Sequence, residues 1–210
     1  MDAEGTVMFL HVAVVILTFM VAGVLHVALL DMRRTDRSSD LAVWAGLVRR
    51  LEPLMPVGGL LILGTGGWLV ELSDGEFSWS QGWVVTSTVA LLAVEGAAAA
   101  WLRPRTRALT AAVSTAGDGL VPVDVRRLIL DPVLWYVSHL ATVTFFGVVF
   151  LMAAKPAGTW TPTAILIASA ALGLLSAAPF VLGGPGATRS SRHRRAWGGR
   201  SHRSRQATTS

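Results

Sequence analysis

The 210-residue chain is 52% hydrophobic and only 15% charged, with a formal net charge of +5 and a mean hydropathy of +0.56. This balance excludes an ordinary water-soluble domain and indicates an integral membrane protein. The sequence contains no cysteine, which excludes disulfides, iron–sulfur clusters and thiolate chemistry. Any metal or haem ligands would therefore come from His, Met or carboxylate side chains.

The first apolar segment, residues 6–30, is long enough to cross a bilayer. It carries no formal charge, and it exceeds the roughly 20 helical residues that span a hydrocarbon core of roughly 30 Å. Two histidines, His11 and His26, interrupt it. A helix that turns 100° per residue places these two side chains about 60° apart, on one wide face.

Apolar residues recur at helical spacing in residues 41–51, and Asp40 precedes them as an N-cap. We interpret this segment as an amphipathic helix that lies on the membrane surface, with Trp44 at the interface. The alternative interpretation is that it extends the span that follows.

Four further spans follow along the chain. The second opens at Pro53 and is rich in glycine, which lets a neighbouring backbone or a flat cofactor come close. The third contains Glu95 among aliphatic residues, and the fourth contains His139. Between these two spans, we expect residues 110–119 to be flexible and residues 122–132 to form a short surface helix.

The sequence thus predicts an all-α, polytopic transmembrane helix bundle of about five spans in a single domain, residues 1–184. Residues 185–210 are rich in Gly, Ser and Arg and have no apolar period, so we expect a disordered basic tail. The predicted spans are residues 6–30, 53–72, 82–102, 132–154 and 162–182.

Arginine is distributed unevenly around these spans. Residues 31–52, residues 103–131 and the tail contain every Arg, whereas the opposite side carries only Lys155. The positive-inside rule then predicts that the N-terminus lies outside and the C-terminus lies in the cytoplasm. The excess of Arg over Lys is typical of a GC-rich bacterial genome, so we expect a bacterial cytoplasmic membrane.

The basic tail lies beside the inner leaflet in this orientation. We expect it to contact anionic lipid headgroups and not nucleic acid, because headgroups are the nearer anions. A membrane protein partner or a second copy of the chain is a further expected partner. The residues predicted to contact headgroups are Arg192, Arg194 and Arg195.

Three ionisable residues are expected at one depth in the membrane. His26, Glu95 and His139 fall roughly 7–12 Å below the inner surface when each residue adds 1.5 Å of helix. Ionisable side chains in lipid normally face the bundle interior and pair with one another, so we predict that these three form a buried polar cluster. His11 lies near the outer surface, where Glu71 is the candidate partner.

Several functions are compatible with such a cluster. A structural or accessory role requires only that the side chains tie helices together by hydrogen bonds. Haem b would use His26 and His139 as axial ligands, with the glycines of the second span beside the ring. A divalent metal would use the same histidines with Glu95, and a transporter or proton pathway is a further alternative. No catalytic motif is present, so an enzyme is not expected.

Several longer motifs stand out: HVALLDMRRTDR, RRLEPLMPVGGLLILGTGGWLV, LDPVLWYVSHL, and the exit Leu-Met-x-x-Lys-Pro formed by Leu151, Met152, Lys155 and Pro156. In these motifs the chain resembles, over about residues 7–160, a family of bacterial predicted integral membrane proteins known as a domain of unknown function. The resemblance implies a polytopic membrane fold and no particular activity. A more distant similarity to copper-resistance D-type membrane proteins and small b-type cytochrome bundles rests on the histidines in apolar helices.

Overall fold

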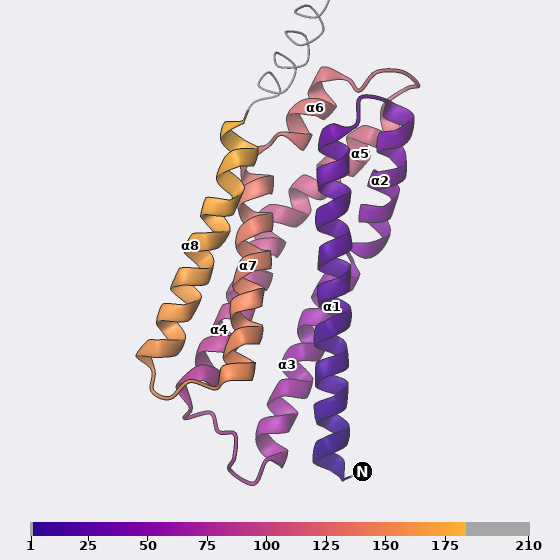
Figure 1. Cartoon of the computed structure of the whole chain (residues 1–210). Coiled ribbons are helices and arrows are strands. Elements are labelled where there is room, and N and C mark those ends of the chain that lie inside the picture. The colour runs from indigo at the N-terminus through magenta and orange to yellow at the C-terminus, as the bar shows by residue number, and fades with distance from the viewer. Residues whose placement is uncertain (1, 184–210) are drawn as a thin grey trace, which may run out of the picture.

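The computed structural model describes residues 2–183, and Figure 1 shows them folded into helices joined by short connections. The predicted basic tail, with Arg192, Arg194 and Arg195, lies outside the described residues. In chain order the helices are α1 (Ala3–Arg34), α2 (Ser38–Leu51), α3 (Leu54–Leu72), α4 (Gly82–Ala97), the π-helical segment η1 (Ala98–Leu102), α5 (Arg103–Thr115), α6 (Val123–Ile129), α7 (Pro132–Ala154) and α8 (Trp160–Leu182).

Five helical segments of the described chain are long and apolar enough to cross a membrane. Each of them contains one predicted span, so the prediction of an all-α polytopic bundle is confirmed. The segments extend beyond the spans because α2 continues into α3 and α4 continues through η1 into α5. They are Ala3–Arg34, Ser38–Leu72, Gly82–Thr115, Val123–Ala154 and Trp160–Leu182.

Local sequence signals define both ends of α7. At its start, the Asp131 side chain accepts a hydrogen bond from the backbone N–H of Val133 at 2.9 Å, and Pro132 occupies the first turn. At its end, Lys155 adopts the left-handed conformation with φ 43°, and Pro156 cannot continue a helix. The predicted span 132–154 therefore coincides with the observed helix.

The spans pack as two groups. α1 packs along α3, whereas α7 packs along α8 and also contacts α4 (Figure 1). Within the second group, a Cβ atom at Gly173 of α8 would lie 2.9 Å from the Cα of Leu140 on α7, so a glycine is needed for this close approach. Between the groups, the rings of Phe19 and Phe145 stack with their centroids 4.5 Å apart.

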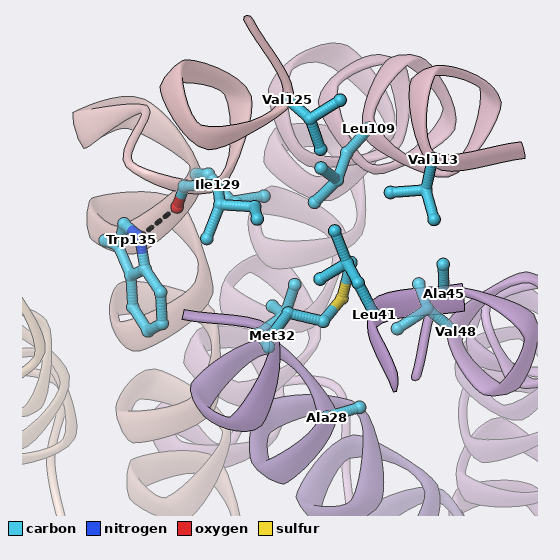
Figure 2. Close-up of a cluster of buried hydrophobic side chains, with 12 residues drawn as sticks. Ala28, Met32, Leu41, Ala45, Val48, Leu109, Val113, Val125, Ile129 and Trp135 are labelled. Carbon is cyan, nitrogen blue, oxygen red and sulfur yellow. Dashed lines mark hydrogen bonds between the residues drawn. The ribbon is translucent and has the colours of Figure 1, made fainter. Parts of the chain in front are cut away.

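Helices α2, α5 and α6 form a helical cap over the end of the bundle opposite the N-terminus of α1 (Figure 1). Figure 2 shows the core that joins this cap to the end of α1 and the start of α7. In this core, the Trp135 indole N–H donates a hydrogen bond to the Ile129 carbonyl at 2.8 Å. The buried members are Ala28, Leu29, Met32, Leu41, Ala45, Val48, Leu109, Val113, Val125, Ile129, Leu134 and Trp135.

The interpretation of α2 as an amphipathic helix with its apolar face on the membrane surface is wrong, because that face packs against protein. Its apolar residues Leu41, Ala45 and Val48 are buried in the cap core, where α2 contacts α1 and α5. The alternative interpretation, that this helix extends the span that follows, agrees with the structure, because α2 and α3 together form the segment Ser38–Leu72. An apolar stripe on a helix fits a protein core as well as a lipid interface, so periodicity did not distinguish the two.

The expectation of flexibility in residues 110–119 is wrong for the part that belongs to α5, which continues to Thr115. Leu109 and Val113 anchor this helix in the cap core, where they are 1% and 3% exposed. The short helix expected in residues 122–132 is confirmed by α6.

Arg126 of α6 links the helical cap to the end of α1 by hydrogen bonds. Its guanidinium donates to the carbonyls of Arg33 and Thr35 at 3.2 and 2.8 Å, and it also pairs with Asp36 at 3.0 Å. The last carbonyls of a helix have no partner within the helix, and a nearby cation stabilises them. Arg126 therefore completes the end of α1.

We predict that the cap core carries a large part of the stability. Leu41→Ala should lower the free energy of unfolding by about 2–5 kcal/mol, because Leu41 is fully buried and its truncation leaves a cavity. Leu60→Ala is the matched control and should have a small effect, because Leu60 is 70% exposed on the lipid-facing part of α3. Titration with SDS in mixed micelles measures both. Equal losses would contradict the prediction.

Candidate functional site

His26 on α1 and His139 on α7 lie in direct contact. Their ring centroids are 4.7 Å apart, and the ring planes make an angle of 74°. His139 is 8% exposed. The structure thus brings together two of the three residues of the predicted cluster.

Each of these imidazoles also bonds a hydroxyl group on another helix. Nδ1 of His26 lies 3.3 Å from Oγ of Ser138 on α7, and Nδ1 of His139 lies 3.0 Å from Oγ of Ser176 on α8. The Ser176 hydroxyl donates to the Gly173 carbonyl at 2.8 Å, so it accepts from His139, which then carries its proton on Nδ1. Nε2 of His139 remains an acceptor, and it is buried without a partner among the described residues.

His11 follows the same pattern towards the other end of α1. Its Nδ1 lies 2.8 Å from Oγ1 of Thr65 on α3. Gly66 leaves room for the ring, because a Cβ there would come 3.2 Å from Cε1 of His11. The expected partner, Glu71, instead accepts from the indole N–H of Trp79 at 3.3 Å. The histidines therefore connect α1 to α3, α1 to α7 and α7 to α8.

The Glu95 carboxylate is paired with Arg103, which differs from the predicted pairing with an imidazole. Nη2 of Arg103 donates to Oε2 of Glu95 at 3.0 Å, and both side chains are 22% exposed. The two residues are eight apart, and eight residues of α-helix would advance about 80° past two full turns. The intervening segment η1 is π-helical and turns less per residue, which brings Arg103 back towards the face of Glu95.

A cavity of about 110 Å³, which we call the polar chamber, lies beside these residues between α1, α3, α4 and α7. Its wall is mostly apolar, but His26, Glu95, Arg103 and Glu52 line it. Oε1 of Glu52 is buried and has no hydrogen-bond partner in the described part of the chain. A chamber of this volume is large enough for several water molecules.

Sequence reasoning missed Glu52 and Arg103 as chamber residues. Both lie at the ends of predicted spans, where charged side chains are ordinary and carry no functional signal. The spacing of eight residues between Glu95 and Arg103 gave no signal, because an uninterrupted α-helix would place the two side chains about 80° apart around its axis. Glu52 lies between α2 and α3, and its place in the wall of the chamber could not be read from the sequence.

Aromatic side chains enclose His139 on the side of the helical cap. The rings of Trp135 and Phe180 stack with their centroids 5.0 Å apart, and the Arg33 guanidinium lies 5.2 and 5.7 Å from these two centroids. The His139 centroid is 4.9 Å from that of Phe180. His139 is therefore held between α1, α8 and its own helix.

The two histidines do not fit haem b. Two imidazoles on opposite sides of one iron, with bonds of roughly 2 Å, hold their ring centroids roughly 6 Å apart. His26 and His139 are 4.7 Å apart in edge-to-face contact, which leaves no gap for a planar macrocycle. In the described residues, no group of three or more His, Cys, Asp or Glu side chains is arranged to hold a metal ion.

Double-mutant cycles will separate these pairs. Glu95→Gln and Arg103→Gln should be coupled by about 0.6–1.7 kcal/mol in the free energy of unfolding, because either change leaves the other group unpaired. Glu95→Gln and His139→Leu should be additive to within about 0.5 kcal/mol, because these side chains share no bond. SDS titration measures both cycles. A coupling of Glu95 to His139 as large as that to Arg103 would refute this assignment.

The chain matches a protein family over residues 5–156, which is more than half of its length. The family is described as "Predicted integral membrane protein (DUF2269)", a description that names no reaction. The match begins in α1 and ends just after α7, so it includes the histidine pair and the polar chamber. No curated protein and no solved structure matches the chain. The protein therefore belongs to the DUF2269 family of predicted integral membrane proteins.

Proposed function

We propose that the protein is a structural or accessory component of the membrane, and that the histidines within its spans serve to tie its helices together. The observation that carries this proposal is that all three described imidazoles bond hydroxyl groups on neighbouring helices, at Thr65, Ser138 and Ser176. Their arrangement supports helix association more directly than ligand chemistry.

The energetics support the same proposal. An imidazole without a partner in hydrocarbon costs several kcal/mol, and a hydroxyl group on an adjacent helix removes that cost. Hydrogen bonds between membrane helices contribute about 0.6 kcal/mol each on average. Bonds of this strength, repeated between successive helix pairs, hold the relative rotation and depth of the helices without needing a cofactor.

We also propose that the protein lies in the bacterial cytoplasmic membrane with the helical cap in the cytoplasm. Every arginine of the described residues lies in α2, α5, α6, the last turn of α1 or the connection from α1 to α2. Lys155, between α7 and α8, is at the other end of the bundle. This asymmetry supports the orientation through the positive-inside rule.

The first prediction from this proposal concerns the absorption spectrum. Full-length protein purified in detergent should show no Soret band in a dithionite-reduced minus oxidised difference spectrum, and metal analysis should find no stoichiometric metal. The reason is that the close contact between His26 and His139 excludes a haem from the site between them. A Soret band at one haem per chain that His139→Leu removes would overturn the structural assignment.

The second prediction concerns orientation. The chain has no cysteine, so single cysteines can report the two ends without a background. In spheroplasts, a membrane-impermeant maleimide should label Ser80→Cys, in the exposed loop between α3 and α4. It should label Asp118→Cys, in the exposed loop between α5 and α6, only after permeabilisation. Labelling of Asp118→Cys in sealed spheroplasts would reverse the orientation.

A further inference from the structure

A second cavity lies between the two helix groups and is larger than the polar chamber. Its volume is about 460 Å³, which is within the roughly 300–1,000 Å³ of small-molecule pockets. Ile62 and Leu91 line both cavities, and they pack together with Phe145. We call this space the interhelical cavity. An apolar partition therefore separates it from the polar chamber.

The walls of the interhelical cavity are apolar and partly flat. Gly66 and Gly67 line it from α3, where the His11 ring lies against Gly66 and Trp79 lies 3.7 Å from the position of a Cβ at Gly67. Trp83 and Phe77 line it as well, with their ring centroids 5.9 Å apart in edge-to-face contact. Backbone without side chains at two glycines and several flat rings in one cavity suit a planar ligand, because a flat ring makes van der Waals contact over its whole face.

Two polar side chains inside the cavity have unused hydrogen-bonding capacity. Ser87 of α4 is 4% exposed, lines the cavity, and its hydroxyl has no partner in the described part of the chain. His11 also lines the cavity. The hydroxyl of its partner Thr65 donates to the Leu61 carbonyl at 2.6 Å, so it accepts from Nδ1–H of His11 and leaves Nε2 as an acceptor. A buried group of this kind gains from a ligand that supplies the missing bond.

The charge of the cavity favours a neutral ligand. Lys155 is the one formally charged residue among the described residues that line it. Its Nζ lies 3.7 Å from a carboxylate oxygen of Glu76 and 4.2 Å from the centroid of the Phe77 ring, so its charge is already compensated. An ionic headgroup would find no free counter-charge here.

We propose that the interhelical cavity binds a neutral, planar, lipid-soluble molecule that carries carbonyl or hydroxyl oxygens, which is the chemistry of an isoprenoid quinone head. The Ser87 hydroxyl donates to a ring carbonyl, and Nε2 of His11 accepts from a ring hydroxyl of the reduced form. The ring lies beside Gly67 and the His11 ring, and the apolar wall holds the adjoining isoprenoid units. The polar contacts of this site, Ser87 and His11, are distinct from the histidine pair and do not line the polar chamber.

The first test blocks the cavity. The probe is 2-methyl-3-prenyl-1,4-naphthoquinone, titrated calorimetrically into the full-length protein in lipid nanodiscs, with empty nanodiscs as blank. Gly67→Leu should weaken binding at least tenfold, because its side chain would enter the cavity while its Cβ makes only an ordinary contact, 3.7 Å from Trp79. Gly64→Leu is the matched control and should leave affinity within about twofold, because its Cβ would meet open space.

The second test removes one hydroxyl. Ser87→Ala should weaken probe binding about fivefold, the value of one hydrogen bond. Thr144→Val is the control and should leave affinity unchanged, because the Thr144 hydroxyl is also buried and unpaired among the described residues but does not line the cavity. Oleyl alcohol, a neutral amphiphile without a ring, should not displace the probe.

Three results would overturn the proposal. The first is the absence of saturable binding by the unmodified protein. The second is equal affinity of the Gly67→Leu and Gly64→Leu proteins, or of the Ser87→Ala and Thr144→Val proteins. The third is the loss of the probe's binding heat when the protein is first saturated with oleyl alcohol, which would show that the cavity takes any neutral amphiphile.

Discussion

A polar side chain inside a bilayer must find its hydrogen-bond partner within the protein, because lipid tails offer none. This constraint explains how the histidines of the chain are used. His11 on α1 reaches Thr65 on α3, His26 on α1 reaches Ser138 on α7, and His139 on α7 reaches Ser176 on α8. Each bond can form at only one depth and one rotation of the two helices, so the requirement for a partner sets how the helices sit against one another.

The stability of the fold is divided between two environments. The helical cap has a continuous core of fully buried side chains, such as Met32, Leu41 and Trp135, as a water-soluble protein does. The spans instead carry exposed Leu, Val and Ile side chains on their outer faces, where lipid covers them and burial gives little driving force. In the spans, the helices are held together by close contact at small residues such as Gly173 and by hydrogen bonds between helices. The cap therefore fixes the ends of α1 and α7 on which the histidine pair depends.

The two cavities have different chemistry although they share a partition. The polar chamber contains a compensated Glu95–Arg103 pair and the unpaired Oε1 of Glu52. The interhelical cavity is larger, apolar and aromatic, with Ser87 as its unpaired group. A structural role for the histidines and a lipid-soluble ligand between the helix groups are compatible, because they use different sets of atoms. Membership in a family described only as integral membrane proteins constrains neither of them.

The sequence by itself determined that the chain has five helices apolar and long enough to cross a membrane, because apolar length depends only on local composition. It did not determine how far each helix continues beyond its apolar stretch, as α2 does before α3 and α5 does after η1. It also fixed the ends of α7 through Pro132 and Lys155, and it identified the histidines. Only the tertiary structure decided their partners, since Ser, Thr and Gly carry no signal in a hydropathy pattern. The pairing of Glu95 with Arg103 depends on the π-helical turn of η1, and the packing of α2 depends on which apolar surface it meets. The pair and the packing of α2 both depend on the direction in which side chains point around a helix axis, and composition does not encode that direction.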